Sequence, residues 1–254
     1  MLFSQAQTRA SWKKTAVLLL LIFLVAGTAA GAATRIGPLG DSITRGGTTV
    51  DSPFPSYRYY LAESFAASGT DVDFVGSLSS GFLGFTFDQQ HEGHGGYTIG
   101  GIVGGVDTGG TLSNWLGGYS PDVALVLIGT NDVLYQTPMT TRFENLGRLV
   151  DVLRAKNPRL KIYLGTLPPT GNEFRNQNSG LIEFNSLLPS WAAKKSNAKS
   201  KIVVVDHYSG YDGVADNQPD GIHPNTAGEQ KIAAKWYGAV MQDLSKGSGR
   251  KPVK

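Results

Sequence analysis

The 254-residue sequence contains no cysteine, and this absence excludes disulfide frameworks, thiolate metal sites and cysteine nucleophiles. Charged residues are also scarce, at 17% of the chain, whereas apolar residues make up 41%, which is not the composition of a disordered protein. The length suffices for one large domain with a substantial core. Glycine is abundant, at 33 positions, so we expect many tight turns and loops.

The formal charge of +3 comes from the two ends of the chain. The first 33 residues contain Arg9, Lys13 and Lys14 and no acidic residue, and residues 246–254 contain four further cations. The part between them has 16 basic and 20 acidic residues and therefore a net charge of −4. Because its basicity is confined to the ends, we do not expect the chain to bind nucleic acid.

The N-terminal segment has the organisation of a secretory signal. Its basic residues precede an apolar run at 15–26, which is followed by small residues up to position 33. The run is short for a membrane span, which needs about 20 residues. We therefore expect cleavage in the alanine-rich end, with an uncleaved anchor as the alternative. The predicted organisation is a signal peptide over 1–33, a domain over 34–245 and a flexible basic tail over 246–254.

Between the two ends, short apolar runs alternate with helical patterns. The runs that predict strands are Arg35–Leu39, Val72–Val75, Val123–Ile128, Ile162–Leu164 and Ile202–Val205. Helices are predicted at Tyr57–Ala67, around 143–153, at Leu181–Trp191 and from Thr226, where Glu229 completes the spacing of a capping box. The glycine-rich segment Gly100–Gly118 is expected to form loop and short helix. This alternation predicts a three-layer α/β/α fold around a five-stranded, doubly wound parallel sheet.

Two short motifs follow predicted strands, at the edge where an open parallel sheet binds its ligands. Gly40-Asp41-Ser42-Ile43 comes after the first strand, and its serine hydroxyl can point into that edge. Gly129-Thr130-Asn131-Asp132 comes after the central strand, and its asparagine can donate an amide N–H there. Taken singly, both motifs are also typical of ordinary turns and helix caps.

Two further motifs contain three of the four histidines. In Asp220-Gly221-Ile222-His223-Pro224, the carboxylate is near enough in sequence to hold the imidazole, and the proline disfavours helical backbone at the histidine. In His91-Glu92-Gly93-His94, followed by Gly95 and Gly96, a metal site is weakly indicated because no further ligands lie nearby. The glycines instead indicate a backbone N–H that faces the site.

Serine, glycine, asparagine and Asp/His blocks in this order resemble the SGNH hydrolases, also called the GDSL esterase family, over residues 35–244. The resemblance implies a flavodoxin-like fold and acyl transfer through a serine ester. It implies Ser42 as nucleophile, His223 as general base and Asp220 as the residue that orients the imidazole. The implied oxyanion hole consists of Ser42, Gly96 and Asn131, and no metal or organic cofactor is required. The Gly-x-Ser-x-Gly elbow of α/β-hydrolases is absent.

Several stretches are similar to carbohydrate esterase family 3. They are Pro38–Thr44, Ser56–Arg58, Phe74–Ser77, His91–His94 and Asp220–Asn225 with Trp236 and Tyr237. This similarity implies an enzyme that removes acetyl groups from plant-wall polysaccharide such as xylan. The signal segment predicts that it is secreted, and we expect a monomer that has no contact with the membrane once this segment is cleaved.

Two other functions remain open at this point. The first is a lysophospholipase, lipase or thioesterase of the same superfamily, in which Phe82, Phe85 and Phe87 line an acyl channel rather than pack in the core. The second is a non-catalytic carbohydrate-binding protein that kept the fold.

Overall fold

The computed structural model describes residues 32–46, 55–82, 84–104 and 111–248. They belong to one compact unit that begins at Ala32. The signal segment predicted over 1–33 lies almost entirely outside the described residues, as does most of the predicted tail.

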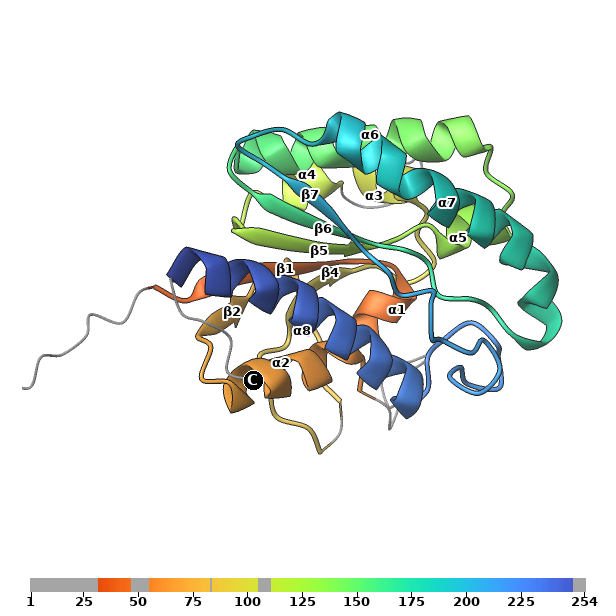
Figure 1. Ribbon diagram of the computed structural model, residues 1–254, viewed down its shortest axis with the longest axis horizontal. Helices are drawn as coiled ribbons and strands as arrows, with labels where there is room; N and C mark the ends of the chain where they lie inside the picture. The colour runs from red at the N-terminus through yellow and green to blue at the C-terminus, as the bar shows by residue number, and fades with distance from the viewer. Residues whose placement is uncertain (1–31, 47–54, 83, 105–110, 249–254) are drawn as a thin grey trace, which may run out of the picture. The chain divides into compact units, whose positions relative to one another are not determined.

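Strand β1 occupies an inner position in a mostly parallel sheet (Figure 1). On one side, β5, β6 and β7 follow in order, each parallel to its neighbour. On the other side, β2 pairs with the first half of β1 and β4 with its end, and β3 is antiparallel to β4. The strands are β1 (Thr34–Gly40), β2 (Val72–Phe74), β3 (Leu78–Ser79), β4 (Gln90–Gly93), β5 (Val123–Leu127), β6 (Lys161–Gly165) and β7 (Ile202–Val205).

The parallel sheet and all five predicted strands are confirmed, but β3 and β4 were not predicted. Strand β4 has the sequence Gln-His-Glu-Gly, and three of its four residues are buried. Hydrogen bonds satisfy the buried polar side chains of this strand, so no alternation of apolar residues marks it in the sequence.

Helices cover both faces of the sheet and form the predicted three layers. Figure 1 shows α3, α4, α6 and α7 on one face and α2 and α8 on the other. The helical segments are α1 (Ser42–Arg45), α2 (Tyr57–Ala67), α3 (Ile99–Gly104), α4 (Leu112–Trp115), α5 (Thr130–Leu134), α6 (Met139–Lys156), the 3₁₀ helix η1 (Asn172–Gln177), α7 (Asn178–Lys195) and α8 (Thr226–Ser248). Helix α8 thus continues into the segment that was predicted to be a tail. The described parts of Gly100–Gly118 form short helices and turns, as expected.

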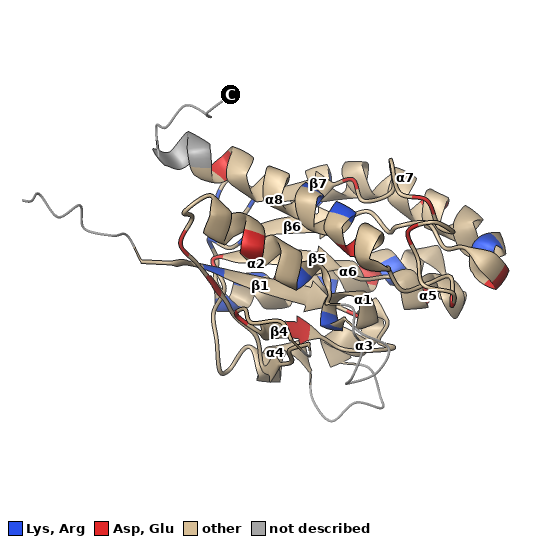
Figure 2. Cartoon of the chain, turned by 90° about the horizontal axis from the view of Figure 1, so that it is seen from below, with Lys and Arg blue, Asp and Glu red and all other residues tan. Residues whose placement is uncertain are grey.

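Charged residues of both signs are interspersed along the described chain (Figure 2). Several form ion pairs between distant segments, such as Arg35 with Asp122 at 2.8 Å and Lys195 with Asp151 at 2.9 Å. Among the described helices, none combines the length and the apolar character that crossing a membrane requires.

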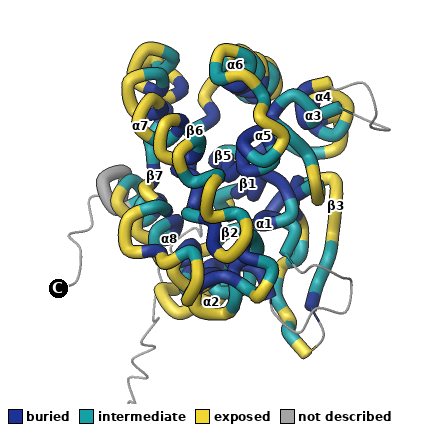
Figure 3. The backbone as a smooth tube through the Cα atoms, turned by 90° about the vertical axis from the view of Figure 1, so that its right-hand side faces the viewer, coloured by how far each residue is buried: buried dark blue, intermediate teal, exposed yellow. Residues whose placement is uncertain are grey.

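The core lies between the sheet and the two helical layers, where the buried segments gather in Figure 3. All five residues of β5 are buried, as expected for a central parallel strand. Helix α6 buries Leu146, Leu149, Val150 and Leu153 at helical spacing, and α8 buries Trp236 completely. This packing fixes the carboxyl ends of the parallel strands, from which α1 and α5 begin.

The start of α8 was predicted correctly, but its cap was not. The side chain of Asn225, rather than that of Thr226, accepts hydrogen bonds from the N–H groups of Ala227 and Gly228, at 2.9 and 3.2 Å. Glu229 does not reach back to the cap. Its buried carboxylate accepts the Tyr57 N–H of α2 at 2.6 Å, so it joins two helices instead of closing a capping box.

Candidate active site

Ser42 is the first residue of α1, directly beyond the end of β1. The Asp41 carboxylate caps this helix by accepting the N–H of Ile43 at 3.0 Å. Only glycine fits at position 40, since a Cβ there would lie 2.1 Å from the Leu127 carbonyl oxygen of β5. The tight passage from β1 into α1 therefore determines where the serine lies.

The structure brings Ser42, His223 and Asp220 into one hydrogen-bonded line. His223 Nε2 lies 2.8 Å from Ser42 Oγ, and His223 Nδ1 lies 2.8 Å from an oxygen of Asp220. The other Asp220 oxygen accepts the N–H groups of Ile222 and His223, both at 2.9 Å. A carboxylate that caps its own turn in this way keeps the imidazole directed at the serine.

The pKa of Asp220 indicates which nitrogen of His223 carries the hydrogen atom. Burial raises the pKa of Asp220, but the hydrogen bonds from Ile222 and His223 outweigh it, and the pKa lies below the usual value. An ionised carboxylate only accepts, so Nδ1 of His223 donates to it. In the neutral imidazole, Nε2 is then the acceptor and receives the Ser42 hydroxyl proton. This is the tautomer that a general base requires.

The two residues predicted to complete an oxyanion hole lie in turns that meet at Tyr97. Gly96 follows β4 with φ of 81°, and its N–H donates no hydrogen bond within the described residues. Asn131 lies in the first turn of α5, and its Nδ2 donates to the Tyr97 carbonyl at 2.9 Å. As the first residue of its helix, Ser42 has an N–H without an intrahelical partner. The role of these donors stays a prediction.

A buried carboxylate beneath this region was not predicted. Glu92 of β4 accepts hydrogen bonds from Ser77 N and Oγ at 2.9 and 2.7 Å and from the Tyr119 hydroxyl at 2.6 Å. It also lies 2.6 Å from Nε2 of His94, whose ring stacks on Trp115. Burial raises the pKa of Glu92, yet these hydrogen bonds bring it below its usual value. The cluster fixes the chain just before Gly95 and Gly96.

His91 and His94 have separate partners. His91 Nδ1 accepts the Gly93 N–H at 2.9 Å, and its Nε2 lies 2.6 Å from Ser80 Oγ. Burial and the nearby Arg58 charge lower the pKa of His91 to about 2, so the ring stays neutral. The described residues contain no group of three His, Asp or Glu side chains that could hold a metal ion.

A second residue that sequence reasoning missed is Arg58, which is fully buried. Its guanidinium donates to the carbonyls of Thr44 and Arg45, at 2.9 and 2.8 Å, and so holds the end of α1. It also donates to the carbonyls of Gln89 and Ser80. The Ser56–Arg58 stretch is similar to carbohydrate esterase family 3, but no local sequence pattern indicates which carbonyls the arginine reaches.

Two of the three phenylalanines considered for an acyl channel pack against this arginine. Phe82 is buried and stacks on Phe87, and both rings lie about 5.5 Å from the Arg58 guanidinium carbon. Phe85 contacts Tyr59 edge-on. These contacts favour a packing role for all three.

Two acids inside the motifs are buried near each other. Burial, opposed by the Ile43 N–H and reinforced by the Asp132 charge, raises the pKa of Asp41 to about 7. Burial also raises the pKa of Asp132 to about 6, against the effect of the Ile99 N–H that it accepts at 2.8 Å. Each has one buried oxygen without a partner among the described residues. Their side chains support the turns through the N–H groups of Ile43 and Ile99.

Comparisons with known proteins identify relatives of similar sequence and fold. A multidomain esterase of Ruminococcus flavefaciens is 32% identical over 240 residues, which cover 87% of this chain but only 30% of that protein. A family 3 carbohydrate esterase from Talaromyces cellulolyticus has a similar structure, with 25% identity, a TM-score of 0.71 and coverage of 84% and 99% of the two chains. The family 3 carbohydrate esterase of Clostridium thermocellum is 28% identical, with a TM-score of 0.68 and coverage of 84% of this chain and 98% of that chain.

The predicted resemblance to the SGNH hydrolases and to carbohydrate esterase family 3 is thus confirmed. The sequence pattern of the GDSL-like lipase/acylhydrolase family matches residues 39–231, which include Ser42, Asn131, Asp220 and His223. The chain belongs to the GDSL-like lipase/acylhydrolase family.

Proposed function

We propose that this chain is a secreted serine esterase that removes short acyl groups, above all acetyl, from plant-wall polysaccharide such as xylan. The observation that carries the proposal is the line from Ser42 through His223 to Asp220, with 2.8 Å at both contacts. The similarity to a multidomain esterase and to family 3 carbohydrate esterases supports ester hydrolysis on a carbohydrate.

In the proposed reaction, Ser42 Oγ attacks the ester carbonyl while His223 Nε2 accepts the hydroxyl proton. Asp220 holds the imidazole and stabilises its charged form. His223 then donates the proton to the leaving sugar hydroxyl, and the serine ester remains. Water hydrolyses this ester by the same acid–base route.

The oxyanion that forms in both steps needs preorganised donors. The backbone N–H groups of Ser42 and Gly96 supply two. Asn131 supplies a third, because its Nδ2 carries two hydrogens and the Tyr97 carbonyl takes only one.

The decisive experiment measures acetate release from acetylated xylan, together with hydrolysis of p-nitrophenyl esters from acetate to decanoate. We expect acetate release and a steep loss of activity with acyl length. Ser42→Ala should lower the activity by at least about 10⁴-fold while the protein stays folded. An active, folded Ser42→Ala variant would contradict the mechanism, and a preference for decanoate would indicate a lipase. Failure of a fluorophosphonate to label Ser42 would favour a non-catalytic protein.

A further inference from the structure

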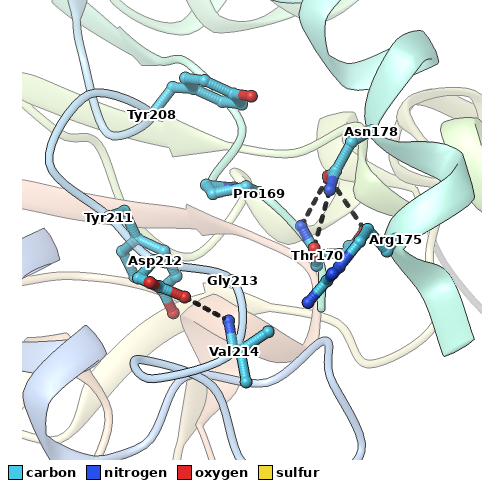
Figure 4. A pocket seen from close by; sticks show the side chains of 9 residues that line it. All are labelled: Pro169, Thr170, Arg175, Asn178, Tyr208, Tyr211, Asp212, Gly213 and Val214. Carbon is cyan, nitrogen blue, oxygen red and sulfur yellow. Dashed lines mark hydrogen bonds between the residues drawn. The ribbon is translucent and has the colours of Figure 1, made fainter. Parts of the chain in front are cut away.

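A second concave site lies beyond the carboxyl ends of β6 and β7 (Figure 4). It is a pocket of about 340 Å³, within the usual size range of small-molecule sites. Its walls come from the chain after β6, the chain after β7, η1 and the start of α7. The lining includes Pro169, Arg175, Tyr208, Asp212 and Val214, but not Ser42, Asp220 or His223.

The pocket is joined to the catalytic turn by hydrogen bonds. The segment after β6 lines the pocket at Pro169 and Thr170, and its next residue, Gly171, donates its N–H to the Gly221 carbonyl at 2.8 Å. Asn217 Nδ2 links the Pro169 and Gly221 carbonyls, at 3.2 and 3.1 Å. A ligand in the pocket therefore contacts the segment that holds the turn of Asp220 and His223.

Several polar side chains that line the pocket make hydrogen bonds within the protein. Asn178 exchanges hydrogen bonds with the backbone N–H and carbonyl of Thr170, both at 2.8 Å. The Tyr211 hydroxyl donates a hydrogen bond to Asn217 Oδ1, and one Asp212 oxygen accepts the Val214 N–H at 2.8 Å. These contacts make a preformed shape.

Other groups remain available to a ligand. Neither the exposed Arg175 guanidinium nor the hydroxyl of the half-buried Tyr208 makes a hydrogen bond within the described residues. Arg175 comes from η1 and Tyr208 from the chain after β7, and they lie on opposite sides of Pro169 in Figure 4. The second carboxylate oxygen of Asp212 adds an acceptor.

These groups select a class of ligand. One positive and one negative side chain in the same pocket favour a neutral molecule over an anion or a cation. The Tyr208 ring, Pro169 and Val214 offer apolar surface, while Arg175 donates and Asp212 accepts hydrogen bonds. A sugar ring presents this combination of C–H faces and hydroxyl groups.

We propose that this pocket is a subsite for an unmodified sugar unit of the polysaccharide whose acetyl ester lies at Ser42. The inference rests on the proposed function and deepens it, since it gives the enzyme a means to bind the polymer chain away from the reacting ester. A small ester such as p-nitrophenyl acetate has no sugar ring to fill the pocket, so the pocket should contribute to binding of the polymer alone.

The test is a calorimetric titration of xylohexaose, cellohexaose and mannohexaose, all without acetyl groups, into the full-length protein. Tyr208→Ala and Arg175→Ala should each weaken binding of the preferred oligosaccharide at least about fivefold. Arg159→Ala, which removes an exposed arginine outside the pocket, should change it less than about twofold. On acetylated polysaccharide, kcat/KM should fall by the same factors, with p-nitrophenyl acetate hydrolysis unchanged.

Equal binding by wild type and both pocket variants overturns the subsite, as does the absence of binding to all three oligosaccharides. The proposed function has its own readout, because Ser42→Ala should abolish hydrolysis and still bind the oligosaccharide with unchanged affinity. Loss of p-nitrophenyl acetate hydrolysis in a pocket variant would show that the residue acts through the catalytic turn and would also contradict the subsite.

Discussion

Asn131 has two amide hydrogens, of which the Tyr97 carbonyl takes one. If the other binds the oxyanion, Asn131→Ala should lower kcat on p-nitrophenyl acetate by about 100- to 1,000-fold, equivalent to about 2.7–4 kcal/mol of transition-state stabilisation. KM should change less, because the lost bond forms in the transition state. Asn114→Ala, at an exposed position of α4, is the control and should keep the wild-type kcat. An unchanged kcat in Asn131→Ala would remove this residue from the oxyanion hole.

Asp41 links stability to pH. Burial raises its pKa to about 7 in the folded state, whereas an aspartate in the unfolded chain titrates near 3.9. The folded state thus holds the proton to higher pH, and the stability that neutral Asp41 contributes is lost as the pH rises through about 7. Asp41→Asn keeps an oxygen to accept the Ile43 N–H but cannot ionise.

We therefore expect Asp41→Asn to gain stability relative to wild type between about pH 4 and pH 7 and to keep that advantage at pH 8. Urea unfolding at several pH values measures the difference. Asp71→Asn, at an exposed position, is the control substitution and is measured under the same conditions. A constant difference for Asp41→Asn would mean that the two states release this proton at the same pH.

At the scale of elements, α1 is a single turn that cannot be stable by itself. Arg58 of α2 secures it through the Thr44 and Arg45 carbonyls. Arg58→Lys keeps the charge but loses the planar set of donors, and buried carbonyls are left unpaired. We expect a loss of at least about 2 kcal/mol of unfolding free energy and a lower kcat, measured by urea unfolding and p-nitrophenyl acetate kinetics. Arg159→Lys on the surface should change neither the unfolding free energy nor kcat. A fully stable, fully active Arg58→Lys would contradict the proposed role of Arg58 in holding α1.

The elements differ in how far their sequences predict them. Strands β5 and β7 and helix α6 follow from apolar runs and helical spacing, because the core selects such residues. Strand β4 could not be predicted, since its burial depends on Ser77 and Tyr119, whose distance from Glu92 in space is not encoded in any local period. The α8 cap was assigned to Thr226 because the role of Glu229 depends on Tyr57, far away in the chain.

The residues of the site also differ in how far the sequence predicts them. Ser42 and Asn131 belong to short blocks directly after β1 and β5, and the carboxyl edge of a parallel sheet brings such blocks together, so their approximate placement could be predicted. Asp220 and His223 lie just before α8 and not directly after a strand, and their spacing and the family resemblance single them out. The Arg58 contacts and the pocket after β6 and β7 could not be predicted, because each combines segments whose packing only the folded chain defines.

The whole molecule should fold without covalent or metal crosslinks, because it has no cysteine and the proposed chemistry needs no ion. We expect thermal unfolding and p-nitrophenyl acetate hydrolysis to be unaffected by dithiothreitol and by EDTA. Refolding from urea should restore activity in the presence of both. A lower melting temperature in EDTA alone would reveal a structural metal, and the measurement in dithiothreitol alone separates that effect from a redox effect.

Ser42 and His223, its proposed general base, are 181 residues apart in the chain. Contacts of such long sequence separation form late, because the loop between them must be closed before they contribute. Esterase activity in a refolding experiment should consequently return after the circular dichroism signal of the helices has recovered. The recovery of activity then reports the docking of the loop before α8, and the enzyme provides its own assay for the last step of its folding.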